Sequence, residues 1–349
     1  MLMTAADYRE SLRALKPRVF VNGRQVASVV DEPLLAPGIN AIGVTYDFAH
    51  RAEYAGLMTA TQQGTGRIVN RMLHVNGNRD DLLAKLEAVR LVCRESGCAQ
   101  RYLAHDALNA LHQGTKLADD VHGGERHQRF LAYLDDVQAR DLTLGIAMTD
   151  AKGDRSARPG KQANRDVHVH IKERRADGII IRGTKAIVTG APYVHEFLVM
   201  ACRTMTAEDA DFALHCAVPA DAPGVMIVAR PAGRPGEAAA KFSAKYGQAT
   251  GVVVFDDVFV PWDRVFMAGE HVEAGYTTTS YATHHRHSCI AARAGFGDLL
   301  IGAGALLGDN WERVGEVFAP IQKLVELAIV VAVVVFAWSR VRKLYRKRT

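Results

Sequence analysis

The sequence contains few cysteines and lacks a recognisable leader segment. Five of its 349 residues are cysteines, an odd number without the spacing of a disulfide framework. The first residues also lack a basic region followed by an apolar stretch and a small-residue cleavage site. These absences argue against a small disulfide-stabilised secreted protein, and they predict a cytoplasmic protein with reduced thiols.

Basic side chains are not in excess outside the end of the chain. The formal net charge is +5, and the last ten residues hold six Lys and Arg side chains without an acid, so the remainder carries −1. A nucleic-acid partner is therefore not expected. The chain is 48% hydrophobic and 23% charged, which is typical of a globular protein with a substantial core.

The apolar stretch near the C-terminus falls short of the roughly 20 residues of a transmembrane helix. Leu327 to Trp338 are twelve apolar residues in a row, and extension back to Ile321 gives 18 residues but includes Lys323 and Glu326. Two interpretations of residues 321–338 remain open. One is a short anchor with a basic cytoplasmic end, which would give membrane contact through the C-terminal segment; the other is a buried bundle helix with a solvated tail.

Hydrophobic periodicity divides the chain into three parts. Apolar residues recur at helical spacing at 80–92, 101–111 and 129–137. Apolar or alternating runs predict strands at 167–171, 178–183, 197–200, 224–229 and 251–255. A helical pattern returns after Tyr276, and Gly295 to Leu307 is small and apolar enough to pack tightly against another helix. The sequence therefore predicts a helical domain at 1–145, a β domain at 146–275 and a partial helical region at 276–349.

Three motifs lie in the β domain. Residues 147–156 (AMTDAKGDRS) form a polar loop whose backbone NH groups and threonine hydroxyl can donate hydrogen bonds, although an ordinary turn has the same composition. Residues 179–191 predict a hairpin in which Gly183 joins two apolar strands, the second ending at Thr189. Residues 251–266 predict a strand and its exit turn, where Asp256 and Asp257 are more simply solvated turn residues than an acid/base pair.

The order of helical, β and helical domains, with these three motifs, resembles the acyl-CoA dehydrogenase architecture. In that fold the first motif lies along the flavin, and the threonine at the end of the second faces the flavin ring. The resemblance implies an α+β fold with an N-terminal helical domain, a middle β-barrel domain and an incomplete C-terminal helical bundle. It also implies bound FAD held by Ala147, Met148, Thr149, Asp154, Arg155, Ser156 and Thr189.

Residues 1 to about 310 are more specifically similar to the 4-hydroxyphenylacetate 3-hydroxylase / 4-hydroxybutyryl-CoA dehydratase family. The segments at 1–5, 11–13, 106–110 and 153–155 look like the dehydratase branch. That branch carries an iron–sulfur cluster beside FAD, ligated by three cysteines and a histidine. Family members also continue well beyond this length, into helices that complete the flavin pocket and the contacts between subunits.

The residues at the ligand positions of that branch depart from its pattern. Cys98 and His285 stand at two of the positions, but Tyr102 and Ala292 occupy the other two. Cys289 lies three residues before Ala292, on a different face of a helix. Because a cluster normally needs every ligand site filled, we expect no cluster and no other metal. Nor do the histidines at 168–170 and 284–287 have carboxylate or thiol partners at ligand spacing.

The acid/base positions of the dehydratase branch are altered as well, from Glu, Tyr and Lys to Thr250, Cys289 and Arg293. The hydroxylase branch uses reduced FAD from a separate reductase to hydroxylate a phenol, and it needs Arg and His donors in a water-poor pocket. Arg101, Tyr102 and His285 are the candidate catalytic residues, with His105 nearby; the alternative is that they are helix-surface residues in ordinary polar contacts.

The resemblance therefore implies a FAD-dependent oxidoreductase, a reduced-flavin monooxygenase that acts on a phenolic small molecule. It further implies a separate flavin reductase as partner and a homo-oligomer. Two alternatives remain: an acyl-CoA enzyme like 4-hydroxybutyryl-CoA dehydratase, or a catalytically silent, membrane-attached relative.

Overall fold

The computed structural model describes residues 2–98, 100–231 and 241–308, with side chains up to residue 301. The chain divides into two compact units, Met1–Gly297 and Asp298–Thr349. The predicted apolar segment at 321–338 lies outside the described residues. Among the helices of the described part, none combines the length and apolar character that a membrane crossing requires.

The first part of the chain is mainly helical, as predicted. Its helices are α1 (Ala5–Ala14), α2 (Ala36–Asp47), α3 (Ala55–Met58), α4 (Arg79–Ser96), α5 (Tyr102–His122) and α6 (Arg126–Arg140). Their ends follow local chemistry. Asn78 caps α4 by accepting from the backbone N of Asp81, two aspartates lie in the first turn, and Gly97 ends the helix at φ +66°.

Short strands in this part were not predicted. β1 (Val19–Val21) pairs with β2 (Arg24–Gln25) and also lies parallel to a strand some 200 residues later, β10 (Val225–Arg230). A separate ribbon pairs β3 (Thr59–Thr61) with β4 (Ile68–Asn70). The helical segment therefore contributes to the sheet of the middle segment, and the predicted division at residue 145 remains a prediction.

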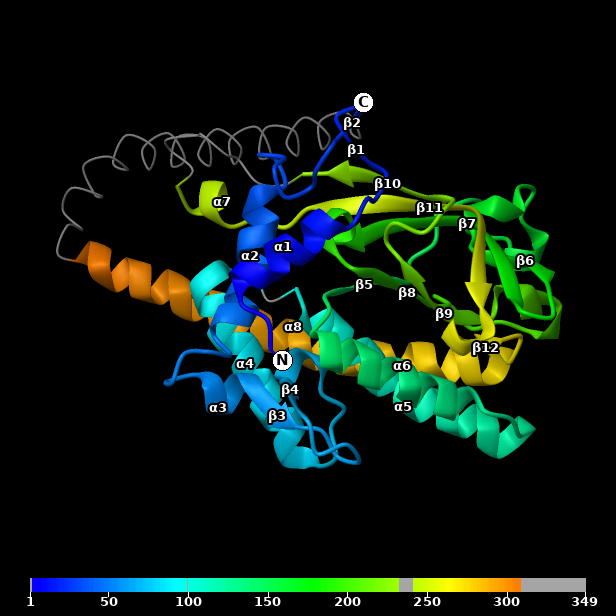
Figure 1. Ribbon diagram of the computed structural model, residues 1–349, viewed down its shortest axis with the longest axis horizontal. Helices are drawn as coiled ribbons and strands as arrows, with labels where there is room; N and C mark the ends of the chain where they lie inside the picture. Colours follow the sequence, from blue (N-terminus) through cyan, green and yellow to red (C-terminus); the bar gives the residue numbers. More distant parts are fainter. Residues whose placement is uncertain (1, 99, 232–240, 309–349) are drawn as a thin grey trace, which may run out of the picture. The chain divides into compact units, whose positions relative to one another are not determined.

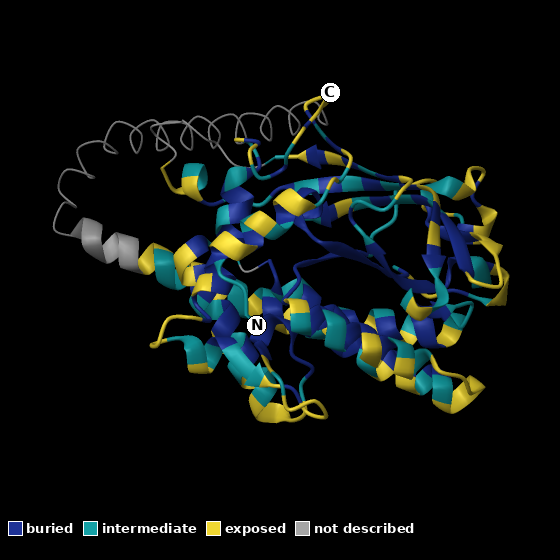
Figure 2. Ribbon diagram, viewed as in Figure 1, coloured by how far each residue is buried: buried dark blue, intermediate teal, exposed yellow. Residues whose placement is uncertain are grey.

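The middle segment forms two sheets whose buried faces share one core (Figures 1 and 2). The six-stranded sheet has the order β2-β1-β10-β11-β7-β6, with β11 at Thr250–Pro261, β7 at Gly178–Thr189 and β6 at His170–Arg174. The four-stranded sheet has the order β12-β9-β8-β5, with β12 at Val265–Ala268, β9 at Leu214–Pro219, β8 at Glu196–Val199 and β5 at Leu144–Ala147. The predicted β-barrel domain thus takes the form of two facing sheets, and its predicted strands at 197–200, 224–229 and 251–255 are present.

The hairpin predicted at Gly183 is wrong. Residues 178–189 form one continuous strand, β7, that runs through Gly183 at φ +129°. A Cβ atom at this glycine would lie 2.3 Å from the backbone oxygen of His168. The glycine therefore permits a close approach of two backbones within a bulged strand, and it does not mark a turn.

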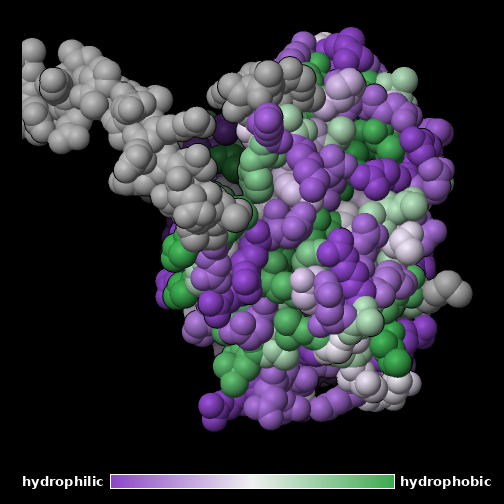
Figure 3. All heavy atoms as spheres, turned by 90° about the vertical axis from the view of Figure 1, so that its left-hand side faces the viewer, coloured by the Kyte–Doolittle hydropathy of each residue, from purple (hydrophilic) through white to green (hydrophobic). Residues whose placement is uncertain are grey.

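The part of helix α8 (His271–Gly308) that belongs to the first unit, up to Gly297, returns along the helical side of that unit, next to α5 and α6 (Figure 1). The prediction of close helix packing holds at Gly295, where a Cβ atom would lie 2.3 Å from the backbone oxygen of Arg90 on α4. Several large apolar side chains of α8 are nevertheless exposed: Val272, Tyr276, Ile290, Phe296, Leu300 and Ile301. Figure 3 shows hydrophobic and hydrophilic residues intermixed on one face of the molecule. The short helix α7 (Lys241–Lys245) precedes β11.

Candidate functional site

The polar loop at 147–156 leaves the end of β5 and is fastened to β7. The backbone N of Ala186 donates to Thr149 O at 2.8 Å, and the backbone N of Ala151 donates to Thr184 O at 3.2 Å. At the root of the loop, the backbone N of Met200 donates to Ala147 O. The loop therefore joins the two sheets in a defined position.

The buried side chain of Lys185 binds the loop from the protein interior. Its ammonium group lies 2.7 Å from Met148 O, 2.8 Å from Met200 O and 2.7 Å from Asp150 Oδ1. The three contacts use all three donors of the ammonium group, and the carboxylate of Asp150 compensates its charge. Lys185 lies within the motif at 179–191, but no role was predicted for it. A lysine inside an otherwise apolar strand is the sequence feature that could have indicated one.

A cavity of about 300 Å³ opens against this loop. Its walls are formed by Thr149, Asp150, Ala151, Lys152, Arg155, His168, Cys202 and Arg203. His168 is buried, its Nδ1 has no hydrogen-bond partner within the described structure, and burial lowers the pKa of its imidazole. Because Asp150 is paired with Lys185, the free charges on the wall are cationic, and the cavity is suited to an anionic or electron-rich polar ligand.

The residues predicted to hold a flavin fall into four groups. Thr149 and Arg155 line the cavity. Asp154 and Ser156 shape the loop, since Asp154 Oδ1 accepts from both the backbone N and the hydroxyl of Ser156. Ala147 and Met148 contribute backbone oxygens to the framework described above. Thr189 ends β7, four residues after Lys185, where it pairs with Thr250.

A second polar group joins α5 to α8. The ring of His285 stacks on Tyr102 with a centroid distance of 5.8 Å and on Tyr281 at 5.4 Å. Its Nε2 lies 3.4 Å from the sulfur of Cys289, and the hydroxyl of Tyr102 lies 3.8 Å from the same sulfur. The structure thus brings together two of the three predicted catalytic residues, Tyr102 and His285.

Asp106 supports this group from the protein interior. Its carboxylate is fully buried, 2.8 Å from both the ammonium group of Lys85 and the hydroxyl of Ser288. His285 Nδ1 lies 3.5 Å from Asp106 Oδ2. Burial alone would raise the pKa of Asp106, but hydrogen bonds from His105 and His285 and the charge of Lys85 lower it, so the carboxylate is ionised at neutral pH.

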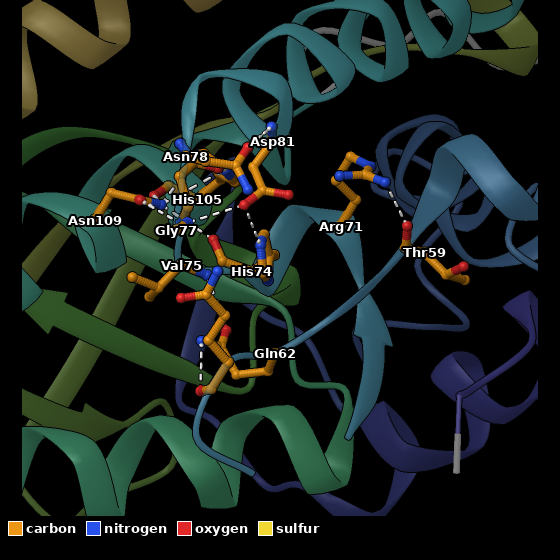
Figure 4. A network of polar contacts seen from close by, with 12 residues as sticks. Thr59, Gln62, Arg71, His74, Val75, Gly77, Asn78, Asp81, His105 and Asn109 are labelled. Atoms are coloured by element: carbon orange, nitrogen blue, oxygen red, sulfur yellow. Dashed lines mark hydrogen bonds and ion pairs between the residues drawn. The ribbon is translucent and has the colours of Figure 1, made fainter. Parts of the chain in front are cut away.

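A network of polar contacts holds His105 on the other side of α5 (Figure 4). His105 Nε2 lies 3.1 Å from Asn76 Oδ1, and the backbone N of Asn76 donates to Asn109 Oδ1. Asn109 donates in turn to His74 O, and His74 Nε2 lies 3.4 Å from Asp81 Oδ2. Burial lowers the pKa of His105 to about 3, so its imidazole is neutral and serves this network.

Arg101 lies in a different environment from Tyr102 and His285. Its side chain is fully buried and donates to Asp141 Oδ1 at 2.6 Å and to Leu142 O at 3.2 Å, and its guanidinium lies 4.0 Å from the ring centroid of Tyr46. These contacts fix the start of α5 to the core, while the Nε atom has no hydrogen-bond partner among the described residues. They give the predicted catalytic role of Arg101 no support.

The iron–sulfur cluster implied by the dehydratase branch does not fit these residues. The thiol of Cys98 donates to Gln248 Oε1 at 3.1 Å, while Tyr102 and Ala292 offer no thiolate. Within the described ranges, no three His, Cys, Asp or Glu side chains converge as a metal site would require. The altered acid/base residues lie on two elements: Thr250 begins β11, whereas Cys289 and Arg293 lie on α8, with the side chain of Arg293 exposed.

Comparisons with known proteins place this geometry in context. The family model described as 4-hydroxyphenylacetate 3-hydroxylase N terminal matches residues 4–267. A 4-hydroxybutyryl-CoA dehydratase/vinylacetyl-CoA-Δ-isomerase of Clostridium aminobutyricum is 39% identical over 316 residues, which are 88% of this chain and 64% of that protein. The oxygenase component of a 4-hydroxyphenylacetate 3-monooxygenase from Thermus thermophilus is 26% identical, over 97% of this chain and 70% of that protein.

Two solved structures have a similar fold. An archaeal 4-hydroxybutyryl-CoA dehydratase from N. maritimus superposes with a TM-score of 0.85 and 36% identity, over 88% of this chain and 62% of that one. An oxygenase component of 4-hydroxyphenylacetate 3-monooxygenase in complex with FAD superposes with a TM-score of 0.77 and 22% identity, over 88% and 64%. The chain therefore spans less than two thirds of the length of several of these proteins.

Proposed function

The chain belongs to the 4-hydroxyphenylacetate 3-hydroxylase family, and from this premise we propose that it is a FAD-dependent oxidoreductase, specifically a reduced-flavin monooxygenase that acts on a phenolic small molecule. The observation that carries the proposal is the loop at 147–156. Its polar backbone is fixed against β7 by Lys185, and it borders a cavity of about 300 Å³ with cationic walls.

The residues of this loop fit a flavin. Thr149 and Arg155 are donors on the cavity wall, and the buried Nδ1 of His168 lacks a partner that a ligand could supply. Thr189 and Ser156 complete the proposed binding set, with Asp154 shaping the loop and Ala147 and Met148 supporting it. When bound, FAD would supply the redox chemistry with oxygen, while these residues position it and hold its polar edges.

Tyr102 and His285 are the proposed substrate-side residues. Both rings lie on the α5–α8 group, where burial raises the pKa of Tyr102 and keeps its hydroxyl protonated as a hydrogen-bond donor. A protonated hydroxyl beside an imidazole can bind a phenol oxygen and exchange a proton with it. We assign Arg101 to positioning the start of α5, because its guanidinium is already engaged.

The proposed partners follow the family. A separate flavin reductase would supply reduced FAD, as suits an oxygenase component, and a homo-oligomer would cover the exposed apolar side chains of α8. Cytoplasmic localisation is part of the same proposal; residues 321–338, the candidate for membrane contact, lie outside the described residues.

The second candidate is an acyl-CoA dehydratase, favoured by the 39% identity to the Clostridium enzyme and the TM-score of 0.85 to the archaeal one. The residues at the functional positions of the dehydratase argue against this candidate. Two cluster-ligand positions hold Tyr102 and Ala292, and two acid/base positions hold Thr250 and Arg293. A catalytically silent relative is the third. Incubation of the full chain with reduced FAD, oxygen and a panel of phenols, and separately with 4-hydroxybutyryl-CoA, distinguishes the three: we expect a hydroxylated phenol, whereas an unsaturated acyl-CoA product or no product would reject the proposal.

A further inference from the structure

The half-buried thiol of Cys289 lies beside an imidazole that faces a buried carboxylate. The sulfur is 3.4 Å from His285 Nε2, and the other ring nitrogen, Nδ1, is 3.5 Å from Asp106 Oδ2. Thiol, imidazole and carboxylate therefore follow one another in the order in which proteins activate a nucleophilic thiol. The three residues come from α5 and from successive turns of α8, so backbone geometry keeps them together.

Both inner members of this series are held in place. Asp106 is fixed by Lys85 and Ser288, and the His285 ring stacks on Tyr102 and Tyr281. Asp106 Oδ2 and His285 Nδ1 face each other across 3.5 Å, and within the described structure neither atom makes a hydrogen bond. The negative charge of the carboxylate favours the tautomer with its proton on Nδ1, which leaves Nε2 free to accept the proton of the Cys289 thiol.

The remaining thiols differ in their surroundings. Burial raises the pKa of Cys98 to about 11 and that of Cys93 and Cys216 to about 12 in each case. Such thiols are poor nucleophiles at neutral pH. Cys202, on the cavity wall, is half-buried like Cys289 and provides a comparison of similar exposure.

A tyrosine hydroxyl lies beside the sulfur. The hydroxyl of Tyr102 lies 3.8 Å from Cys289 Sγ, and burial keeps it protonated by raising its pKa. A hydroxyl at this place can donate a hydrogen bond to the oxygen that departs when the sulfur attacks a bound oxidant. The half-buried setting admits a small reagent more readily than a bulky one.

We propose that Cys289, His285 and Asp106 form a thiol relay that reduces small hydroperoxides, with hydrogen peroxide as the simplest. His285 Nε2 takes the thiol proton while the sulfur attacks one peroxide oxygen; the S–O bond forms as the O–O bond breaks. The leaving oxygen takes the proton from His285, so the products are Cys289 sulfenic acid and water. The choice of hydroperoxide rests on the proposed oxygenase function, because reduction of oxygen without hydroxylation of a substrate yields hydrogen peroxide.

The test is the rate of sulfenic acid formation at each cysteine. The full chain is reduced, desalted and treated with hydrogen peroxide in the presence of dimedone, and the labelled peptides are quantified by mass spectrometry. We expect Cys289 to be labelled at least about tenfold faster than Cys202, and His285→Gln to remove most of that difference. His287→Gln, an exposed histidine on the same helix, is the matched control and leaves the rate unchanged.

Equal labelling of Cys289 and Cys202 in the unaltered chain would overturn the relay, and so would a His285→Gln variant that reacts as fast as the parent. The comparison within the unaltered chain remains decisive even where a variant folds poorly. Because peroxide is added directly, the outcome does not depend on FAD binding. Flavin content measured on the same sample separates failure of the relay from failure of the proposed function.

Discussion

Lys185 in β7 donates a hydrogen bond of 2.7 Å to the backbone oxygen of Met148, at the start of the loop that borders the cavity. The lysine is buried and is also paired with Asp150 in the same loop. One side chain therefore connects the position of the loop to the interior of the β region. The conformation of the proposed flavin site therefore depends on Lys185, which is buried behind the loop.

Lys185→Met should loosen this loop and weaken flavin retention. It removes the ammonium donor from two backbone oxygens and the counter-charge from the Asp150 carboxylate, which still accepts from the backbone N of Val169. We therefore expect the free energy of unfolding to fall by about 3 kcal/mol. Urea unfolding and the FAD retained after gel filtration measure the two effects. Lys172→Met, which breaks an exposed pair with Asp257, should cost less than about 1 kcal/mol and retain flavin. Similar losses in both variants would refute a special role of Lys185.

Arg155→Ala combined with Thr189→Ala should reduce bound FAD while the protein remains folded. Both residues lie at the surface of the β region, Arg155 on the cavity wall and Thr189 at the end of β7, so neither substitution empties the core. Flavin absorbance per chain is the readout. Arg175→Ala, in an exposed ion pair away from the loop, is the control. Full flavin content in the double variant would mean that the binding set is wrongly assigned.

Anaerobically purified protein should contain no four-iron cluster, because Tyr102 and Ala292 cannot replace thiolate ligands. Iron and acid-labile sulfide assays test this expectation. Close to stoichiometric cluster content would show that the chain recruits other ligands, for which Cys289 is the nearest candidate, and it would favour the dehydratase alternative.

Stability should fall as the pH is lowered from about 6.5 toward 4. Burial lowers the pKa of His105 and His195 to about 3 and that of His215 to about 4, against 6.5 for a free imidazole. Below pH 6.5 the unfolded chain gains protons that the folded chain excludes. Each such histidine therefore lowers the free energy of unfolding by up to about 1.4 kcal/mol for each pH unit below 6.5. Its full contribution to stability is present above pH 6.5.

Urea unfolding at pH 7 and pH 5 measures this dependence. His195→Gln, which keeps a polar side chain near Ser11 and Thr143, should flatten the slope even if it lowers stability overall. His287→Gln should leave the slope unchanged because this histidine is exposed. A free energy of unfolding that is the same at both pH values would contradict the neutral, buried state of these imidazoles.

The main helices and several strands could be predicted from the sequence because their signals are local. The apolar residues at helical spacing over 80–92 predict α4, and continuous β-branched runs predict β11. β1 and β2 could not be predicted, since they are three and two residues long and exist only through pairing with each other and with β10. Gly183 was misread because a glycine at a close approach of two backbones and a glycine in a turn have the same local sequence.

The candidate site was predicted in part. The resemblance to the acyl-CoA dehydrogenase architecture implied that residues 147–156 lie along a flavin, which stays a prediction, and the approach of His285 and Cys289 follows from their spacing of four residues on one helix. The position of Tyr102 beside them depends on how α5 packs against α8, which no local pattern encodes. The catalytic role of Arg101 stays a prediction, and its burial, its pairing with Asp141 and its place over the Tyr46 ring could not be foreseen from the sequence.

Titration of the purified full chain with FAD, followed by visible absorbance and quenching of flavin fluorescence, tests the central claim most directly. We expect saturable, stoichiometric binding of FAD at the loop at 147–156. Lys185→Met should weaken FAD binding, and Lys172→Met should leave it unchanged. Absence of saturable binding by the folded chain, or binding indifferent to Lys185→Met and to the Arg155→Ala with Thr189→Ala variant, would contradict the assignment of this loop as a flavin site.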